Sequence, residues 1–437
     1  MTKNITVTTV GLGYIGLPTS ALIASNEIPV NGMDVNSSVV ETINRGEIHI
    51  VEPELNNYVK EVVEKGFLKA YTDVKPADVY LVVVPTPFKG DHEPDISFVE
   101  AATKNIIPLL KEGDLFIIES TSPVGTTEKM AELIATERPD LITNNSKLKT
   151  QHSKLRTQYL NIHMAYCPER VLPGNVMYEL VQNDRVIGGV DEESTERAVE
   201  FYSMFVKGEL HRTNARTAEM CKLTENASRD VQIAFANELS LISDKAGINV
   251  WELIKLANKH PRVNILQPGC GVGGHCIAVD PYFITSEYPR ESQLIGKARE
   301  TNNYKSFWVA EKIQNAKLEF QLKNGRAPKV AIMGLAFKPN IDDLRESPAK
   351  YIAQKVIQSA GDEEVFFVEP NINEHNLFKL TNYKEAYEKA DIVAFLVAHD
   401  EFKKLTTQNS TLNTQHSQLT THNSQKVVLD FCGVTNK

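Results

Sequence analysis

Short apolar segments alternate with helical segments over the first third of the chain. Apolar runs bounded by turn residues predict buried strands, and the stretches between them have helical spacing. The predicted strands are Ile5–Val10, a strand ending at Met33-Asp34, Tyr80–Val84, Leu115–Glu119 and His163–Tyr166. A helix is expected at Tyr14–Ser25, directly after the first strand. Strands separated by helices in this way indicate βαβ units and a parallel sheet.

The pattern then becomes helical. A segment without Pro or Gly runs from about Thr217 to Ala246 and predicts one long helix, which Gly247 can end. A second helix is expected at about Ser292–Leu322, and Lys323–Pro328 has the composition of a linker. The strand–helix alternation starts again after it. The strands predicted there are Lys329–Met333, Val365–Val368, Ile392–Val397 and Val427–Asp430.

The fold class expected from this order is α/β, with two parallel-sheet domains joined by a central helical domain that contains one long helix. The domain boundaries expected from the pattern are 1–212, 213–322 and 323–437.

Two polar segments interrupt the pattern of strands and helices. Asn145–Gln158 contains NSKLKTQ and HSKLRTQ, and Asn409–His422 contains NSTLNTQ and HSQLTTH. With one apolar residue in each copy they cannot form a coiled-coil seam, so we expect polar surface loops at about 145–158 and 405–425.

Composition limits what the chain can bind. Of its 437 residues, 42% are hydrophobic and 24% are charged, as in soluble globular proteins. A formal net charge of −9 without a long basic stripe argues against a nucleic-acid partner. No apolar run approaches the roughly 20 residues of a membrane span. The first residues, Met1–Thr9, show no basic n-region and no cleavage site, so we expect no secretory signal. We therefore expect a cytoplasmic protein with no membrane partner.

A glycine motif follows the first predicted strand. It comprises Gly11, Gly13, Tyr14, Ile15 and Gly16. In a GxGxxG turn the first glycine makes the tight turn, the second lets the backbone approach a pyrophosphate, and the third allows close helix–strand packing. Asp34 closes the second predicted strand, where a carboxylate can bind the ribose hydroxyls of NAD and would repel the 2′-phosphate of NADP. A Rossmann-like domain that binds NAD is therefore predicted.

Hydroxyl-bearing segments follow two later predicted strands. Pro85–Pro87 includes Thr86, and Glu119–Pro123 includes Thr121. Open α/β sheets bind ligands at the carboxyl ends of their strands, so these hydroxyls are expected on the nicotinamide side. Ordinary turn chemistry is the alternative interpretation for each residue.

The most informative stretch is Gly269–Asp280, which reads GCGVGGHCIAVD. Its glycines permit a tight loop in which backbone N–H groups converge near the sulfur of Cys276 and a substrate can approach closely. Asp280 lies four residues beyond Cys276, so one helical turn would bring its carboxylate back towards the thiol.

The spacing of the five cysteines matches neither a disulfide framework nor a zinc site, so we expect free thiols and no metal. Those interpreted as packing residues are Cys167, Cys221, Cys270 and Cys432.

This stretch resembles the nucleophile loop of the UDP-glucose/GDP-mannose dehydrogenase family, in which GGxC is followed by Asp four residues on. Further motifs of the family occur in the expected order, and the resemblance covers essentially the whole chain except the two polar repeats. These motifs are the Lys-x-x-x-Asn of Lys222–Asn226, the Pro-Glu loop of Cys167–Arg170, the STxPVGT segment with Thr121, and the nucleotide-sugar motifs of Gly334–Pro339 and Asp342–Pro348.

The resemblance implies a four-electron oxidation of the CH2OH group of a UDP-sugar, with NAD as oxidant and a thiohemiacetal and thioester on Cys276. It implies that Lys222 and Asn226 stabilise oxyanions, while Asp280, Glu169 and Thr121 handle protons and water. The implied NAD contacts are Gly11, Gly13, Tyr14, Ile15, Gly16, Asp34, Thr86, Thr121 and Arg345. The implied substrate contacts are Glu169, Arg262, Gly273 and Lys338.

Two other classes of protein would account for part of the sequence. A two-electron hydroxyacid dehydrogenase has no need of a cysteine such as Cys276, and a non-catalytic NAD-binding scaffold would be expected to lack several of the motif residues. The resemblance also implies a homodimer or higher oligomer that pairs through the long helix, with Arg262 reaching the neighbouring subunit.

The identity of the sugar follows from the substrate loops. After Glu169 the chain reads RVLPGN, where glucose-type members of the family carry Phe-Leu-x-Glu-Gly. This loop and the stretch before Cys276 resemble the N-acetylhexosamine branch. We expect UDP-N-acetyl-D-mannosamine as substrate, supplying surface polysaccharide, with UDP-N-acetyl-D-glucosamine as the alternative and UDP-glucose behind both.

Overall fold

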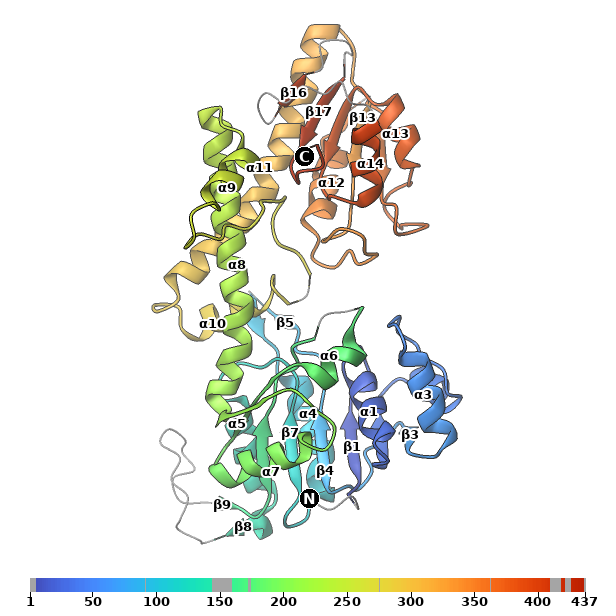
Figure 1. Cartoon of the computed structure of the whole chain (residues 1–437), viewed down its shortest axis with the longest axis vertical. Coiled ribbons are helices and arrows are strands. Elements are labelled where there is room, and N and C mark those ends of the chain that lie inside the picture. The colour runs from blue at the N-terminus through green and yellow to red at the C-terminus, as the bar shows by residue number, and fades with distance from the viewer. Residues whose placement is uncertain are drawn as a thin grey trace. The chain divides into compact units, whose positions relative to one another are not determined.

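The computed structural model describes residues 5–90, 92–143, 159–171, 174–274, 276–361, 363–408, 418–420 and 426–435. By compactness the chain divides into two units, Met1–Thr224 and Glu225–Lys437 (Figure 1). The boundary falls inside a long helix, α8 (Ala215–Ala246). The division into three domains made from the sequence stays a prediction.

The N-terminal unit is built on an eight-stranded sheet with the order β12-β11-β10-β7-β4-β1-β2-β3. Its strands are β1 (Val7–Val10), β2 (Val30–Met33), β3 (Leu68–Tyr71), β4 (Val79–Val82), β7 (Leu115–Ile118), β10 (His163–Tyr166), β11 (Arg185–Gly189) and β12 (Leu210–Asn214). From β3 to β10 all neighbours are parallel, in the order typical of dinucleotide-binding sheets. The strand β11 joins antiparallel to β10, and β12 is parallel to β11.

Helices cover both faces of this sheet, so its central strands are buried along their whole length. These helices are α1 (Gly16–Ser25), α2 (Ser37–Asn44), α3 (Leu55–Glu64), α4 (Ser97–Ile106), α5 (Thr126–Glu137), α6 (Val176–Gln182) and α7 (Glu192–Tyr202). Successive side chains of β4 point to opposite faces. Val79 and Leu81 enter one apolar core, while Tyr80 and Val82 enter the other.

The helical part of the C-terminal unit has two long helices, α8 and α11 (Gln293–Asn324), and two short ones, α9 (Val250–Ala257) and α10 (Asp280–Glu287). Gly247, with φ of 68°, follows the end of α8 as predicted. The predicted linker begins too early, because Lys323 and Asn324 are helical. Helix α11 extends to Asn324, and Gly325, with φ of 67°, forms its left-handed C-cap.

The C-terminal sheet has the order β14-β13-β15-β17-β16, and its first four strands are parallel (Figure 1). Its strands are β13 (Val330–Met333), β14 (Val365–Val368), β15 (Ile392–Phe395), β16 (Gln418–Thr420) and β17 (Val427–Asp430). Its helices are α12 (Pro348–Gln358), α13 (Tyr383–Lys389) and α14 (Asp400–Gln408). The α/β class with a central helical region is therefore confirmed.

One polar repeat was misjudged in part. Residues 418–420 pair antiparallel with β17, so the prediction of a surface loop is wrong for them. The open edge of β17 offers unpaired backbone groups that such a segment can bind. Residues 405–408 of the expected loop are helical as well, because they form the end of α14. The rest of this segment, and the repeat at 145–158, lie outside the described residues.

No described helix combines the length and the apolar composition needed to cross a membrane. Among the described residues there is likewise no group of three or more His, Cys, Asp or Glu side chains that could hold a metal ion.

Candidate active site

The turn between β1 and α1 has the geometry of a pyrophosphate-binding loop. Gly11 has φ of +97°, and a Cβ atom there would lie 2.3 Å from the carbonyl oxygen of Val83. A Cβ atom at Gly16 would lie 1.9 Å from the carbonyl oxygen of Gly11, so neither position admits a side chain. Gly13 has no neighbouring atom within 4 Å on its Cβ side. That open side leaves room for a pyrophosphate at the N-terminus of α1, with Tyr14 and Ile15 beside it.

Asp34 follows β2 and turns its carboxylate to this loop. Leu12 N–H donates to Oδ2 at 3.1 Å, and Asn36 N–H donates to Oδ1 at 2.9 Å. An acid in this place binds the ribose hydroxyls of NAD. His49, which the sequence analysis did not single out, interacts with the same group. Burial lowers the pKa of His49, while Asp34 and a backbone hydrogen bond with Leu12 act in the opposite sense.

Replacing Asp34 by Ala should weaken NAD binding by about tenfold and relax the discrimination against NADP, because the variant loses the hydroxyl acceptor and the charge that repels a 2′-phosphate. Titration of the enzyme with each dinucleotide measures both effects. Glu64→Ala, which removes an exposed acid on α3, is the matched control. An unchanged ratio of the two affinities would place Asp34 outside the ribose site.

The segments after β4 and β7 are joined by hydrogen bonds at the carboxyl edge of the sheet. Val84 N–H donates to Ser120 Oγ at 2.8 Å, and Thr86 Oγ1 donates to the carbonyl oxygen of Thr121 at 2.6 Å. The structure therefore brings the predicted residues Thr86 and Thr121 together. The Thr86 hydroxyl uses its proton within the protein, and its role towards nicotinamide stays a prediction.

Helix α8 holds the continuation of this segment. Gly125 N–H and Thr127 N–H donate to the Glu219 carboxylate at 2.5 and 2.8 Å. Burial raises the pKa of Glu219 to about 7, against the effect of these hydrogen bonds. Glu219 could not be recognised from the sequence, because nothing in the helical pattern distinguishes it from a solvent-exposed glutamate.

Glu169 follows β10, and its side chain is fixed from two directions. Arg185 Nη1 donates to Oε2 at 2.8 Å, and Arg170 N–H donates to Oε1 at 2.6 Å. Lys222 Nζ donates to the carbonyl oxygen of Glu169 at 2.7 Å. The structure thus brings together two residues to which the sequence assigns catalytic roles, Glu169 and Lys222.

Arg185 belongs to a buried polar cluster that the sequence analysis missed. Tyr202 OH donates to Glu119 Oε1 at 2.5 Å, and the guanidinium of Arg185 lies 5.5 Å from the Tyr202 ring centre. Burial raises the pKa of Glu119 to about 7 and that of Cys167 to about 12. Cys167 is therefore a thiol at neutral pH, in agreement with its predicted role as a packing residue.

In the C-terminal unit, Cys276 lies four residues before the start of α10. Asp280 is the first residue of that helix, and its N–H donates to the carbonyl oxygen of Cys276 at 2.8 Å, which is the predicted helical turn. The Asp280 carboxylate is buried and accepts a hydrogen bond from Asn226 Nδ2 at 2.5 Å. The structure therefore brings Asn226 and Asp280 together. Asn226 lies one turn along α8 from Lys222.

Exposure distinguishes Cys276 from the other cysteines. Cys276 is exposed, whereas the remaining four are buried or partly buried. Cys270, in the same loop, lies with Sγ 3.4 Å from the carbonyl oxygen of Leu396, and burial raises its pKa to about 12. A nucleophile has to be reached by substrate, so the exposure favours Cys276 over Cys270.

The glycines before Cys276 serve packing against the C-terminal sheet domain. A Cβ atom at Gly273 would lie 2.7 Å from Phe337 Cβ, and Gly274 N–H donates to the carbonyl oxygen of Arg345 at 3.1 Å. The prediction that the glycine N–H groups converge near the sulfur is therefore wrong for Gly274, because its N–H group is bound elsewhere. His275 lies outside the described residues.

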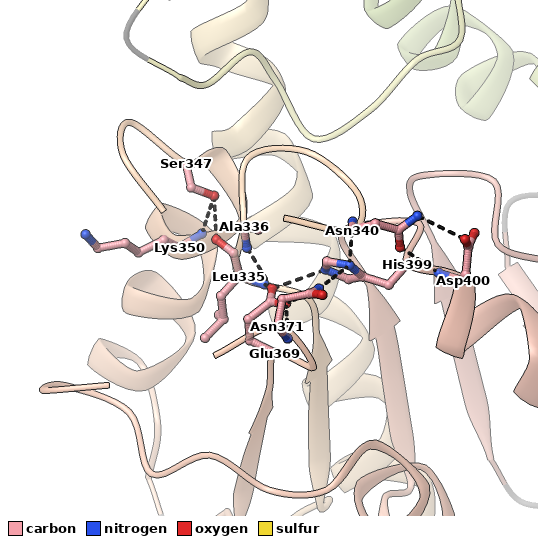
Figure 2. Close-up of polar contacts among 9 residues, drawn as sticks. All are labelled: Leu335, Ala336, Asn340, Ser347, Lys350, Glu369, Asn371, His399 and Asp400. Carbon is pink, nitrogen blue, oxygen red and sulfur yellow. Dashed lines mark hydrogen bonds and ion pairs between the residues drawn. The ribbon is translucent and has the colours of Figure 1, made fainter. Parts of the chain in front are cut away.

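The loop after β13 is held by a buried carboxylate (Figure 2). Glu369 Oε2 accepts hydrogen bonds from Leu335 N–H at 2.8 Å and Ala336 N–H at 2.9 Å, and lies 3.2 Å from His399 Nε2. Asn340 N–H donates to His399 Nδ1 at 3.0 Å. That nitrogen must therefore be an acceptor, so we assign the proton of the neutral ring to Nε2, which donates to Glu369.

This loop has the same geometry as the turn after β1, but the acidic residue beside it has a different role. Gly334 has φ of +100°, close to that of Gly11, and Glu369 follows β14 as Asp34 follows β2. Glu369 is buried, whereas Asp34 is partly exposed, and a ribose would need an accessible carboxylate. The second sheet is thus built like the first, and its acid stabilises the loop.

The remaining predicted ligand contacts are basic residues at the surface. Lys338 and Arg262 are exposed, and Arg345 is exposed and paired with Asp343 at 2.6 Å. Lys338 and Arg345 belong to the loop that packs on Gly273 and Gly274. The assigned roles of these three basic residues stay predictions.

Comparison with known proteins extends this description. Residues 5–206 match the NAD binding domain of the UDP-glucose/GDP-mannose dehydrogenase family, residues 216–304 its central domain and residues 331–437 its UDP binding domain. UDP-N-acetyl-D-mannosamine dehydrogenase of Escherichia coli (strain K12) is 55% identical over 412 residues, which cover 92% of this chain and 96% of that protein. NDP-N-acetyl-D-galactosaminuronic acid dehydrogenase of Ralstonia nicotianae is 50% identical over 406 residues, covering 92% of each.

Among solved structures, UDP-N-acetyl-mannosamine dehydrogenase from Staphylococcus aureus superposes with a TM-score of 0.81 and 37% identity, covering 99% of each chain. The chain therefore belongs to the UDP-glucose/GDP-mannose dehydrogenase family, a class of NAD-dependent nucleotide-sugar dehydrogenases. The family, the enzyme class and the cofactor predicted from the sequence are confirmed.

Proposed function

We propose that this chain oxidises UDP-N-acetyl-D-mannosamine to UDP-N-acetyl-D-mannosaminuronate. The observation that carries the choice of sugar is the 55% identity, over 92% of the chain, to an enzyme with that substrate in its name. The exposed Cys276 beside the Asn226–Asp280 pair supports the four-electron reaction. The overall change is CH2OH plus two NAD⁺ and water, giving COO⁻, two NADH and three protons.

The residues present fit NAD at the turn after β1, because Gly13 is open and Asp34 faces the loop. NAD supplies the hydride acceptor for each oxidation. The sugar alcohol first becomes an aldehyde, to which the Cys276 thiolate adds to form a thiohemiacetal. A second oxidation gives a thioester, and water cleaves it to the carboxylate and regenerates the thiolate.

Charged and polar groups of the chain assist these steps. We assign stabilisation of the oxyanions to the Lys222 ammonium and the Asn226 amide. Proton and water handling are assigned to Glu169, Asp280 and Thr121. Arg185 orients the Glu169 carboxylate, and Asn226 orients that of Asp280.

The quaternary structure and the compartment are part of the same proposal. Phe235 and Ile242 on α8 and Phe307 on α11 are each more than half exposed, which supports pairing of two chains through these helices. A catalytic thiolate needs a reducing compartment, which supports a cytoplasmic location. The product is a sugar acid of the kind used in surface polysaccharide.

A panel of nucleotide sugars tests the substrate. UDP-N-acetylmannosamine should give the highest kcat/KM, with two NADH formed per sugar consumed. UDP-glucose should be at least about 10³-fold poorer, because polar groups that bind the acetamido group would be buried without partners. UDP-N-acetylglucosamine, UDP-N-acetylgalactosamine and GDP-mannose complete the panel. Preference for UDP-glucose or GDP-mannose contradicts the acetamido assignment, and preference for another N-acetyl epimer contradicts only the mannosamine part.

A further inference from the structure

The loop that carries Cys276 is tied to helix α8 at both of its ends. At the C-terminal end, Asn226 Nδ2 donates to the Asp280 carboxylate at 2.5 Å. At the N-terminal end, Gly269 N–H donates to Asn237 Oδ1 at 2.9 Å. Asn226 and Asn237 are three helical turns apart, about 16 Å along the axis. One helix thus sets the positions of both loop ends.

Asn237 is fully buried and belongs to a directed chain of hydrogen bonds between α8 and α11. Its Nδ2 donates to Asn302 Oδ1 at 2.8 Å, and Asn302 Nδ2 donates to Asp230 Oδ1 at 2.8 Å. Arg299 Nη1 donates to the same oxygen at 2.6 Å. All four side chains are buried.

The groups at the two ends of this series of hydrogen bonds determine the orientation of the side-chain amides of Asn237 and Asn302. A main-chain N–H, here that of Gly269, can only donate, and Asp230 Oδ1, which already accepts from the guanidinium of Arg299, acts as an acceptor. Rotating the amide of Asn237 or Asn302 would place two donors or two acceptors face to face in a buried region. The acceptor offered to Gly269 is therefore held in one orientation.

Helix α11 supports the middle of the loop. Ser306 Oγ donates to the carbonyl oxygen of Cys270 at 2.8 Å. A Cβ atom at Gly271 would lie 2.7 Å from Ser306 Oγ and 2.9 Å from the carbonyl oxygen of Asn302. The backbone therefore rests directly on α11, and the position of Asn302 affects both the packing of the loop and its hydrogen-bonded anchor.

We propose that Asn237 is a positioning residue for Cys276. Through Gly269 it fixes the nucleophile loop to the helix that carries Asn226, so the thiolate is held in place when the sugar aldehyde forms. The part that concerns the aldehyde rests on the proposed function, whereas the anchoring of the loop does not. Without the anchor, the first oxidation continues, but capture of the aldehyde by Cys276 is slowed and the aldehyde leaves the enzyme.

Asn237→Ala tests the proposal, with Ser240→Ala as its matched control. Ser240 is a buried polar residue of the same helix that accepts a hydrogen bond from Lys305 Nζ at 2.7 Å and donates to the carbonyl oxygen of Asn237 at 2.5 Å. Its side chain makes no hydrogen bond with the described residues of the loop. Hydrogen–deuterium exchange of peptide 269–280 is measured in the full-length protein without ligand. Acid formation and aldehyde trapped by a hydrazine are measured during turnover.

In Asn237→Ala we expect exchange of the loop amides to be at least about tenfold faster and kcat for acid at least about tenfold lower. Trapped aldehyde should appear, and KM for NAD should stay within about twofold, since the NAD contacts at Gly11–Gly16 and Asp34 lie in the other unit. Ser240→Ala should show none of these changes. If Asn237→Ala does not fold, Asn302→Ala, which removes the acceptor of Asn237 Nδ2, is measured in the same way.

Loop exchange equal to that of Ser240→Ala would overturn the proposal. Faster exchange without a lower kcat and without released aldehyde would overturn it too, because the anchor would then have no catalytic consequence. A wild-type protein that oxidises no UDP-sugar would instead contradict the proposed function. The exchange measurement would still decide whether Asn237 anchors the loop.

Discussion

Replacing Cys276 by Ser should lower sugar-acid formation by at least about 10³-fold and leave NAD binding within about twofold of wild type. A serine hydroxyl is not ionised at neutral pH, and the ester it would form is cleaved by water more slowly than a thioester. The NAD contacts at Gly11–Gly16 and Asp34 belong to the other compact unit. Product analysis by anion exchange and titration with NADH measure the two effects separately.

The control for this variant is Cys432→Ser. Cys432 is partly buried after β17, where its Sγ lies 3.5 Å from the carbonyl oxygen of Phe395. This change alters a cysteine to which only a packing role is assigned, so acid formation should stay close to that of the wild type. If Cys276→Ser makes acid at a near wild-type rate, Cys276 has no part in the mechanism.

The sequence predicted most of the strands that are buried on both faces, although it missed the interior strand β11, which reads RVIGG. The run VYLV of β4 lies at the centre of its sheet, so every residue is apolar and the strand is visible in the pattern. Strand β12 reads LHRTN and was not predicted. It lies at the edge of the sheet with one neighbour, where polar residues are tolerated and the hydrophobic pattern is lost.

Only those parts of the candidate site that are related by short spacing within a motif could be predicted from the sequence. Lys222 and Asn226 are four residues apart on one helix, and Cys276 and Asp280 are linked by one turn, so local geometry relates each pair. Arg185 and Asn237 act through Glu169 and Gly269, which are distant along the chain. Such pairings depend on tertiary packing, and neither residue type nor spacing in one sequence indicates them.

Glu369→Gln should destabilise the C-terminal unit by about 2–4 kcal/mol at neutral pH. Glutamine can offer one oxygen to Leu335 N–H, Ala336 N–H and His399. Its amide group would then face the donors of Asn371, which now bind the second carboxylate oxygen at 3.1 and 3.2 Å. Urea unfolding followed by tryptophan fluorescence reports this unit, because both tryptophans, Trp251 and Trp308, belong to it.

This loss of stability should depend on pH with a defined sign. Burial alone would raise the pKa of the Glu369 carboxyl, but His399 and the amide groups of Leu335 and Ala336 outweigh it and hold that pKa below its ordinary value of 4.5. A carboxyl whose pKa is depressed by folding stabilises the protein fully above its unfolded pKa, and this contribution disappears as the pH falls through the folded pKa. The difference between wild type and Glu369→Gln should therefore be largest near pH 7 and shrink at about pH 3.5. Glu374→Gln, an exposed neighbour, should change stability by less than about 0.5 kcal/mol at either pH. A difference for Glu369→Gln that grows as the pH falls would contradict the assignment of Glu369 as the ionised acceptor that holds the loop.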